Sequence, residues 1–429
     1  RADTYSYTVY GHSWIDHEWL AEIPYYLAWR GFGVVGIKAL SLLILELIFG
    51  GLLYLCWRKS ENIKAAAAAC YFAILLGSVS FGPRTILLGY GCLFALLLII
   101  ENFRAKGKAR LWMLPVLFCA WINTHGSWSL GLIVFAIFIA GGLVEGRWGS
   151  VEATRWTAAQ LRRLCTTLAA SIAALFVNPY GYRLVLYPFD MAFHQRLNIA
   201  HVAEWSSVDF HNLRGKIALL FMVTLLVGSL LGRHRWQLYE LSFVLFGIYA
   251  AFTYVRFLFL AGILAAPLIA NMLNFIPQYS PVIDRPILNA AIIAGALAFV
   301  AWAFPTSREL WQSVDREYPA EALPQLASLR PSDRVLNYYL WGGYLGWNDP
   351  AFRDFIDSRV DVFEYAGVLR DYLDLLDLKK PDAILDKYNI RYVLFPPDEP
   401  LSYALAHDAG WRVVFRGSAS VLFERAGSG

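Results

Sequence analysis

Long apolar runs constrain this chain more than any other feature of its sequence. A helix that crosses the hydrocarbon core of a bilayer needs about 20 apolar residues, and fewer suffice where the helix is packed inside a bundle. We therefore predict a mainly α-helical protein, a polytopic transmembrane bundle with about ten visible spans. The spans are predicted at residues 37–57, 65–82, 86–101, 111–123, 129–145, 164–178, 216–232, 238–252, 257–273 and 287–304.

The composition supports a membrane location. Hydrophobic residues make up 58% of the 429 residues and charged residues only 16%, whereas soluble globular domains carry about 25% charged residues. A chain of this kind lacks the polar surface that soluble domains of this total size would need. The composition therefore excludes an ordinary cytosolic enzyme, a disordered protein and a nucleic-acid-binding protein.

The charge distribution divides the chain near residue 304. Residues 1–304 carry 23 Lys and Arg against 14 Asp and Glu, whereas residues 305–429 carry 14 against 19. In the second part, short apolar runs alternate with Pro, Asp and Gly, which is typical of a small α/β layer. We predict a transmembrane helical domain at 1–304 and a soluble, extracytoplasmic α/β domain at 305–429. Strands are expected at 335–340, 355–357, 392–395, 413–415 and 421–423, and helices near 319–329, 363–377, 381–388 and 400–409.

The orientation follows from the short loops. One alternate set of loops holds most of the Lys and Arg residues, and the other short loops hold little beyond Arg84 and Arg256. Because Lys and Arg favour the cytoplasmic side, residues 1–36, the loop 179–215 and the whole tail from 305 are predicted to face outward.

Polar and aromatic residues gather in these outward segments. They occur at Trp14–Leu20 (WIDHEWL), Trp121–Gly126 (WINTHG), Asn178–Arg183 (NPYGYR) and Glu204–Asp209, and Arg256 lies between two apolar helices. Carboxylates, imidazoles and rings at one membrane face are suited to binding a polar head attached to a lipid tail. The alternative is structural, since Trp and Tyr mark membrane interfaces generally and Asn-Pro-Tyr-Gly is a helix stop with a turn.

We make predictions for one further residue and two further segments. Glu46 stands within an apolar run, so we expect it to face the bundle interior, with Arg84 or Arg256 as its partner. Trp341–Trp347 (WGGYLGW) combines flexible backbone with flat rings suited to stacking on a sugar, or forms a Gly-rich turn. Asp357–Asp361 (DSRVD) offers carboxylates and a guanidinium, or forms a solvated loop.

These segments together resemble the GT-C superfamily of membrane glycosyltransferases that use polyprenyl-phosphate sugars, and more closely an uncharacterised bacterial branch of it. The resemblance rests on the outward segments above and on Trp341–Leu345 followed by Ile356–Arg359, which together span most of the chain. Trp341–Trp347 is also faintly similar to the Trp-Trp-Asp-Tyr-Gly segment of oligosaccharyltransferase catalytic subunits. Gly343 stands where that segment has its aspartate, which argues against a role in binding an acceptor peptide.

The resemblance implies a reaction and a set of residues. It places the protein in a bacterial inner membrane, where it would transfer a sugar from a polyprenyl-phosphate donor to an envelope glycan, lipid or protein acceptor. Catalytic acids of the superfamily lie in the first outward loop, of which Asp3, Asp16, His17, Glu18 and Glu22 are present here. Asp16, His17 and Glu18 are the catalytic candidates, and one carboxylate would act as general base. Arg84, Arg183 and Arg256 would stabilise the departing phosphate. The other substrate-binding candidates are Asn123, His125, Glu204, Trp341, Tyr344, Asp357 and Arg359.

Two expectations concern the loop and a metal. The sequence begins at Arg1 rather than Met, and we expect an upstream segment with a first helix, the beginning of the outward loop and a further catalytic aspartate. Some members of the superfamily use a divalent metal ion, and Asp16, His17 and Glu18 offer ligands for one. Adjacent residues seldom all face one ion, so metal dependence stays open.

Two other functions compete with glycosyl transfer. One is a transporter or flippase of a lipid-linked saccharide, although no pair of Gly/Pro-broken helices occurs in matching halves of the sequence and few ionisable groups fall at mid-membrane. The other is a non-catalytic assembly protein whose outer domain binds envelope glycans. An acidic pair just after an upstream helix would favour catalysis over both.

Overall fold

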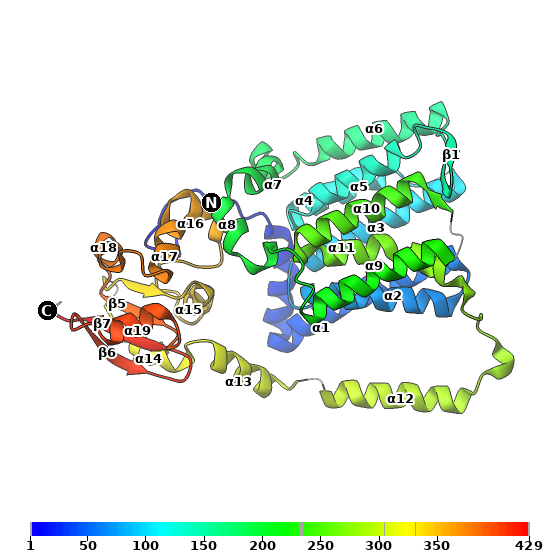
Figure 1. Cartoon of the computed structure of the whole chain (residues 1–429). Helices are drawn as coiled ribbons and strands as arrows, with labels where there is room; N and C mark the ends of the chain where they lie inside the picture. The colour runs from blue at the N-terminus through cyan, green and yellow to red at the C-terminus, as the bar shows by residue number, and fades with distance from the viewer. Residues whose placement is uncertain (1, 108, 232–234, 304, 331, 428–429) are drawn as a thin grey trace. The chain divides into compact units, whose positions relative to one another are not determined.

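Two compact units make up the chain (Figure 1). The computed structural model describes residues 2–107, 109–231, 235–303, 305–330 and 332–427. One unit, here called the helical unit, comprises Asp16–Asp190 and Ala200–Arg285. The other, here called the α/β unit, comprises Arg1–Ile15, Met191–Ile199 and Pro286–Gly429. These two units are defined by contacts within the fold. The predicted division at 304 instead concerns which residues lie in the membrane and which lie outside it, and it stays a prediction.

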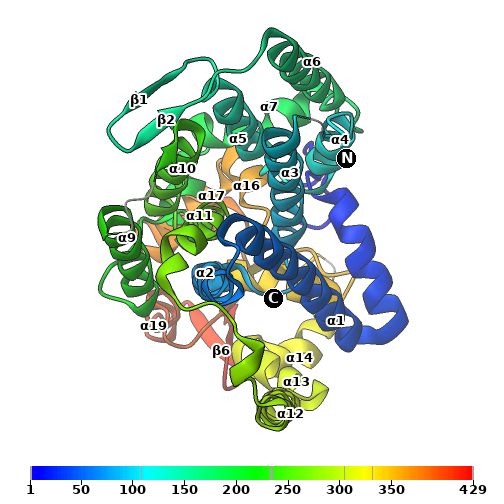
Figure 2. The ribbon, with the colours of Figure 1, turned by 90° about the vertical axis from the view of Figure 1, so that its right-hand side faces the viewer.

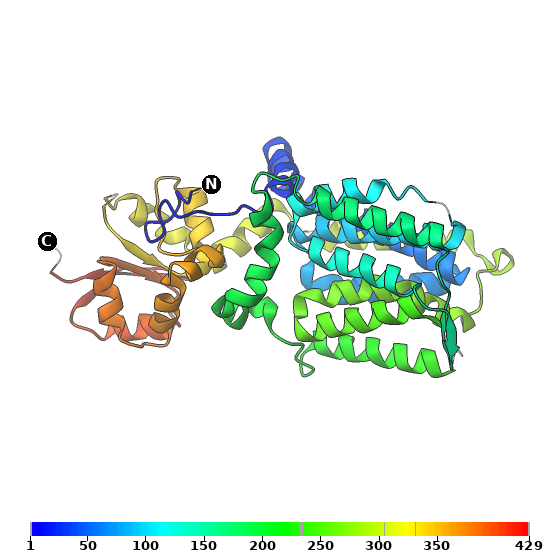
Figure 3. The ribbon, with the colours of Figure 1, turned by 90° about the horizontal axis from the view of Figure 1, so that it is seen from above.

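The helical unit is a bundle of apolar helices with a small three-stranded sheet, ordered β1-β2-β3. Figure 3 shows most of the bundle helices running in nearly the same direction. Its elements are α1 (Trp19–Ser60), α2 (Ile63–Gly77), α3 (Ile86–Lys106), α4 (Met113–Thr124), α5 (Trp128–Ala140), β1 (Gly146–Trp148), β2 (Val151–Ala153), α6 (Ala158–Ala174), α9 (Leu213–Leu231), β3 (Trp236–Gln237), α10 (Leu238–Thr253) and α11 (Leu258–Met272). Two further helices, α7 (Tyr182–His194) and α8 (Arg196–His201), cross the division between the units.

Helix α11 forms the core of this bundle. It is buried along nearly its whole length and packs against α1, α2 and α10, and Figure 2 shows it between α2 and α10. The approach to α2 depends on small residues, because a Cβ at Gly262 would lie 3.2 Å from the Cα of Ala73. Small residues that let backbones come close are typical of helix contacts inside membranes.

Helix α1 changes direction at Gly33. This residue has φ +60° and ψ −145° inside the helix, a combination that glycine adopts at little cost and other residues avoid. The first half of α1 therefore runs across the ends of the other bundle helices, and the second half runs along them (Figures 1 and 3). The predicted span 37–57 corresponds to the second half, and Glu18 comes directly before the first half.

The prediction of about ten spans is wrong in number. All ten predicted segments contain helix, but within the described residues six helices are long and apolar enough to cross a membrane: Trp19–Ser60, Ile63–Ser80, Ile86–Lys106, Leu213–Leu230, Val255–Phe275 and Pro286–Ala303. Helices α4, α5 and α10 are apolar but have only 12, 13 and 16 residues. At 1.5 Å per residue they reach about 18–24 Å, short of the roughly 30 Å hydrocarbon core. Helix α6 has 17 residues and carries Arg162 and Arg163.

The prediction for Glu46 is also wrong. Ile44, Ile48, Leu52 and Leu55 form the buried face of α1, and Glu46 lies on the exposed face beside the exposed Leu47. Two residues of helix turn a side chain by about 200°, so a buried Ile44 directs Glu46 away from the bundle. Arg84 has a different partner, described below.

The α/β unit contains a four-stranded sheet with helices from the same part of the chain. The strand order is β4-β5-β7-β6, with β4 parallel to β5 and the other neighbours antiparallel. The strands are β4 (Val335–Asn337), β5 (Tyr392–Phe395), β6 (Trp411–Arg416) and β7 (Val421–Arg425). The helices of this part are α12 (Pro286–Ala303), α13 (Ser307–Glu317), α14 (Leu323–Ala327), α15 (Gly342–Asn348), α16 (Val360–Tyr365), α17 (Val368–Leu376), α18 (Pro381–Lys387) and α19 (Pro400–Ala406).

Four of the five predicted strands are confirmed, and the one at 355–357 is wrong. Its backbone is held by a side chain instead: Asn337 accepts from the Phe355 N–H at 2.7 Å and donates to the Ile356 carbonyl at 2.8 Å. Only Asp354 forms a bridge, parallel to Ser6. The segment Trp341–Trp347, for which a Gly-rich turn was one of two alternatives, forms most of the short helix α15.

Candidate functional site

A carboxylate and two imidazoles meet where α1 begins. Glu18 precedes the first residue of α1, and the next residue, Trp19, donates from its indole N–H to the Asn123 side chain at 2.9 Å. Asn123 also donates to the carbonyls of Cys119 at 2.8 Å and Val177 at 2.9 Å. Three separate segments thereby fix the position of the residue that follows Glu18. Both N–H groups of the Asn123 amide are thus used by the protein.

Glu18 has three polar neighbours. The Thr85 hydroxyl donates to Oε2 at 2.6 Å, and Nε2 of His125 and of His17 lie 3.4 Å and 3.6 Å from Oε1. The Glu18 side chain is 27% exposed, so solvent or a substrate can reach it. The His17 ring stacks on Tyr187 at 4.6 Å between centroids. The carboxylate is therefore oriented by its neighbours and still accessible.

His125 is a neutral imidazole at neutral pH. Burial lowers its pKa to about 4. Its Nδ1 accepts the backbone N–H of Ser127 at 3.0 Å, so the single proton of the neutral ring resides on Nε2, which faces Glu18. The sequence Thr-His-Gly-Ser provides this geometry, since the turn after α4 brings the Ser127 N–H back to the ring.

The Glu18 carboxyl is ionised at neutral pH. Burial raises its pKa, but His125, His17, the Thr85 hydroxyl and Arg256 together outweigh burial, and the pKa lies below its usual value. With His125 uncharged at neutral pH, its contribution is the Nε2–H dipole. An ionised carboxylate of this kind can accept a proton from a hydroxyl placed beside it.

Arg84 pairs with Glu204. Its guanidinium forms a two-pronged ion pair with the carboxylate, one prong being 2.8 Å long. Burial raises the pKa of Glu204, but the hydrogen bonds and charge of Arg84, together with the charges of Arg256 and Arg214, outweigh burial and leave the pKa below its usual value. Each charge neutralises the other, so Glu204 is a less suitable base than Glu18 and Arg84 is not a free cation.

Arg256 is a buried cation with an unused donor. Its guanidinium carbon lies 4.3 Å from the centre of the Trp205 ring, a cation–π geometry. The Arg256 Nε is buried and has no hydrogen-bond partner within the described parts of the chain. Its backbone carbonyl accepts from the Tyr90 hydroxyl at 2.9 Å, which fixes the segment. Buried donors in native proteins are nearly always satisfied, so the unused N–H makes Arg256 a candidate for holding an anion.

Two other candidates from the outward loops occupy different surroundings. Asp16 is buried, at 3% exposure, and its backbone N–H donates to the Tyr180 hydroxyl at 3.2 Å. Arg183 is exposed in the first turn of α7, and no ion pair joins it to the Glu18 cluster among the described residues. Of the cations predicted to bind phosphate, Arg256 is the one whose surroundings favour that role.

The predicted residues of the tail belong to the α/β unit. Arg359 contacts two buried carboxylates, Asp357 and Asp3, each at 2.5 Å. Its guanidinium carbon also lies 5.0 Å from the ring centres of both Tyr5 and Trp14. These contacts connect the first residues of the chain to the segment between α15 and α16.

Asp354 adds a third carboxyl to this group. Burial raises its pKa well above the usual value, Asp357 raises it further, and Arg359 opposes the rise. Asp357 and Arg359 are therefore part of a buried charge cluster rather than of a solvated loop.

Trp341 and Tyr344 have unequal exposure. Trp341 is 3% exposed, packs in the core with Leu345 and Leu394, and donates its indole N–H to the Glu317 carbonyl at 3.0 Å. A ring in this position is not available for stacking on a sugar. Tyr344 is half-buried against Tyr318, with 5.0 Å between ring centres.

No group of three or more His, Cys, Asp or Glu side chains in the described part of the chain is arranged to hold a metal ion. Asp16, His17 and Glu18 therefore do not converge as a set of ligands here. The sequence analysis did not identify Thr85, whose hydroxyl donates to Glu18 at 2.6 Å. The signal was a hydroxyl residue directly before the apolar run of α3, adjacent to Arg84.

No family model and no curated protein matches the sequence. Among solved structures, the fold is similar to that of ArnT from Cupriavidus metallidurans bound to undecaprenyl phosphate, with 15% identity and a TM-score of 0.54, over 95% of this chain and 87% of that one. It is also similar to the oligosaccharyltransferase of Archaeoglobus fulgidus tethered to an acceptor peptide, with 13% identity and a TM-score of 0.51, over 91% of this chain and 62% of that one. At these identities the likeness is one of fold. The chain has the fold of these two proteins, and within its described residues six helices are long and apolar enough to cross a membrane.

Proposed function

We propose that this protein is a membrane glycosyltransferase that uses Glu18 as general base and Arg256 as the phosphate-binding cation. The acceptor hydroxyl would give its proton to Glu18 as its oxygen bonds to the anomeric carbon of the donor sugar. The bond from that carbon to the phosphate oxygen would break, and the polyprenyl phosphate would leave as an anion. The observation that carries the proposal is the unused, buried Arg256 guanidinium N–H next to an ionised and accessible carboxylate.

The chemistry requires a base and an anion site close together. Glu18 meets the first need, because its orientation is fixed by Thr85 and His125 and its side chain is partly exposed. Arg256 meets the second, because a guanidinium recognises phosphate with parallel N–H donors and gains strength in a water-poor site. Arg84 and Glu204 both interact electrostatically with Arg256.

The donor, the acceptor and the location form part of the proposal. A polyprenyl-phosphate sugar is supported by the fold shared with ArnT, whose structure contains undecaprenyl phosphate. The site is placed at the outer face of a bacterial inner membrane, with the α/β unit on the same side and an envelope glycan, lipid or protein as acceptor. The basis is the distribution of Lys and Arg among the short loops.

The test measures donor binding and turnover separately in the full-length protein. The probes are undecaprenyl phosphate for binding and a panel of labelled undecaprenyl-phosphate hexoses and pentoses for sugar release. We expect Glu18→Gln to keep undecaprenyl phosphate affinity and lower turnover by about 10²–10⁴-fold, the usual contribution of a general base. Arg256→Gln should weaken undecaprenyl phosphate binding by about tenfold or more.

Glu46→Gln is the matched control, since this carboxylate lies on the exposed face of α1. It should change neither quantity. Wild-type turnover in Glu18→Gln would disprove the base assignment. A wild-type protein that binds undecaprenyl phosphate but releases no sugar from any donor of the panel would contradict transfer and favour a transport or binding function.

A further inference from the structure

A polar cavity lies at the end of the helical unit where α3 ends. It has a volume of about 480 Å³ and is formed by the last turns of α1 and α3, the beginning of α10, the middle of α11 and residues 154–160. Arg104 lies 19 residues after Thr85 in the chain, which corresponds to about 28 Å of helix. That length is close to the thickness of the hydrocarbon core, so the cavity and the Glu18 cluster belong to opposite membrane surfaces.

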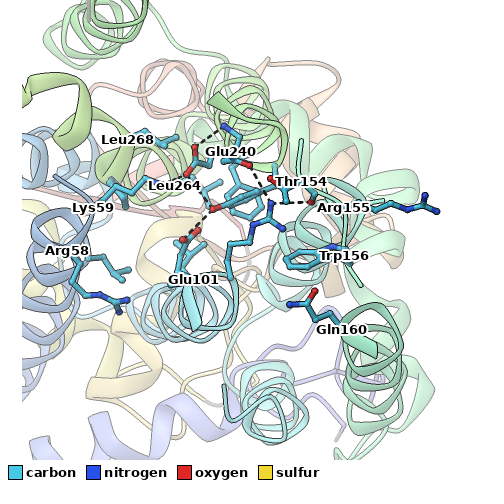
Figure 4. A pocket seen from close by; sticks show the side chains of 18 residues that line it. Arg58, Lys59, Glu101, Thr154, Arg155, Trp156, Gln160, Glu240, Leu264 and Leu268 are labelled. Carbon is cyan, nitrogen blue, oxygen red and sulfur yellow. Dashed lines mark hydrogen bonds and ion pairs between the residues drawn. The ribbon is translucent and has the colours of Figure 1, made fainter. Parts of the chain in front are cut away.

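Some charged residues of the cavity have their hydrogen-bonding groups occupied by other residues of the protein, and others do not. Lys59 pairs with Glu240, and Glu240 also accepts the backbone N–H of Gln237 at 3.1 Å. Glu101 accepts a long hydrogen bond from the Tyr239 hydroxyl, at 3.4 Å. These groups form the connected network drawn in Figure 4, where the Arg155 side chain extends away from it.

Arg58 and Arg104 keep donors for a ligand. Arg58 donates to the Asn102 side chain at 2.7 Å. Arg104 donates from one terminal nitrogen, Nη2, to the Thr154 carbonyl at 3.2 Å and to the Gln237 side chain at 3.4 Å, and its guanidinium carbon lies 4.4 Å from the centre of the Trp156 ring. Each guanidinium has five N–H donors, so most of them remain for an anion. With Arg155 turned away, three cations face two carboxylates, and the excess of one positive charge matches one phosphodiester.

Part of the cavity lining is apolar. It consists of Leu55, Leu97, Phe243, Leu264, Pro267 and Leu268, and α1, α3 and α11 are all candidate spans. A soluble anion would leave this apolar part in contact with water. A lipid would place its phosphate at the arginines and its first methylene groups on the leucines.

We propose that this cavity binds the phosphodiester head group of an anionic glycerophospholipid from the leaflet opposite the proposed donor site. The ligand is amphiphilic because charge and apolar surface meet within one cavity. Arg58 and Arg104 hold the phosphate, and the Glu101–Tyr239 pair accepts from the hydroxyl groups of a glycerol head. The inference does not depend on the sugar-transfer proposal, since it concerns other residues at the other membrane surface.

The test uses the purified full-length protein in bilayer nanodiscs. Phosphatidylglycerol diluted into phosphatidylcholine is the lipid probe, and native mass spectrometry counts the phosphatidylglycerol molecules that stay bound after extraction into neutral detergent. We expect the wild type to retain phosphatidylglycerol in preference to phosphatidylcholine. Arg104→Gln and, separately, Arg58→Gln should each reduce this retention by about tenfold.

Arg155→Gln is the control, because it removes a nearby cation that points away from the cavity. It should retain phosphatidylglycerol as the wild type does. Arg58→Gln removes a single side-chain hydrogen bond, so it stays informative if Arg104→Gln fails to fold. Equal retention of the two lipids by the wild type, or equal losses in Arg155→Gln, would overturn the proposal. Tight binding of free glycerol 3-phosphate would overturn the lipid source and indicate a soluble phosphate.

Discussion

His125 shows how one buried side chain makes the site sensitive to pH. Its pKa is about 4 in the folded protein and about 6.5 when unfolded, so the unfolded chain binds more protons between these values. The free energy of unfolding therefore rises with pH through this window. The stability that the low pKa of His125 contributes is lost as the pH falls from about 6.5 to about 4. A difference of this size corresponds to about 3 kcal/mol.

We expect His125→Gln to remove this dependence. The glutamine is uncharged at every pH, so the thermal midpoint of the variant should change less between pH 7 and pH 5 than that of the wild type. The measurement is a melting curve of the detergent-solubilised protein at each pH, with His211→Gln as control. His211 is exposed, and its replacement should leave the pH dependence unchanged. A variant as acid-sensitive as the wild type would show that another group causes the loss.

Single residues of the site could be predicted from sequence where their chemistry was conspicuous. Glu18, His125 and Arg256 stand out in the sequence as ionisable groups between apolar runs. In the structure these three residues interact electrostatically with one another. The use of each residue could not be predicted, because it depends on side-chain contacts between distant segments. Arg84 finds Glu204, 120 positions away, whereas Glu46 faces outward because of its place in the helical repeat.

At the scale of elements, the link between α1 and α4 decides where Glu18 stands. Asn123 joins Trp19, Cys119 and Val177 through three hydrogen bonds. Asn123→Leu would leave these three groups without their partner. A hydrogen bond contributes about 0.5–1.5 kcal/mol to stability, so we expect the loss of all three to lower the free energy of unfolding by about 3 kcal/mol.

The consequence for function separates positioning from substrate contact. If Asn123 acts only through the position of Glu18, Asn123→Leu should lower turnover while leaving undecaprenyl phosphate affinity near the wild-type value. Denaturant unfolding and the two assays described above provide the readouts. Asn348→Ala, in the exposed end of α15, loses one hydrogen bond and should change none of them. A large loss of lipid affinity in Asn123→Leu would instead place Asn123 in the binding site.

Element types were easier to predict than their lengths. Each apolar run predicted as a span contains a helix in the structure. A helix buried in protein and a helix buried in lipid are both rich in apolar residues, so the sequence shows the helix but not which of the two surrounds it. The apolar runs overstated the spans, since α4, α5 and α10 are as apolar as a span and shorter than one. The strand at 355–357 failed because Asn337, a side chain from another strand, satisfies its backbone.

At the scale of the whole molecule, the two compact units and the predicted division at 304 differ. The units group residues that contact one another, and the division separates stretches of different charge. Residues 1–15 and 191–199 join the α/β unit through local contacts, for example from Arg359 to Asp3 and from Glu364 to the backbone of Leu197 at 2.9 Å. No composition argument could show this, because those segments are distant from the tail in sequence. Their membership requires that the first residues and the tail be on the same side of the membrane.

This requirement yields a prediction for sidedness. Single cysteines would be introduced at Asp209, in an exposed loop of the helical unit, at Asp398, exposed in the α/β unit, and at Arg147, exposed in β1. Each would be placed in a full-length protein whose native cysteines are replaced. A membrane-impermeant maleimide should label positions 209 and 398 in intact cells, and position 147 only after the membrane is permeabilised, since basic loops favour the cytoplasm. Labelling of 398 together with 147 and apart from 209 would place the α/β unit across the bilayer from Glu18, and an acceptor bound by that unit could not reach the proposed base.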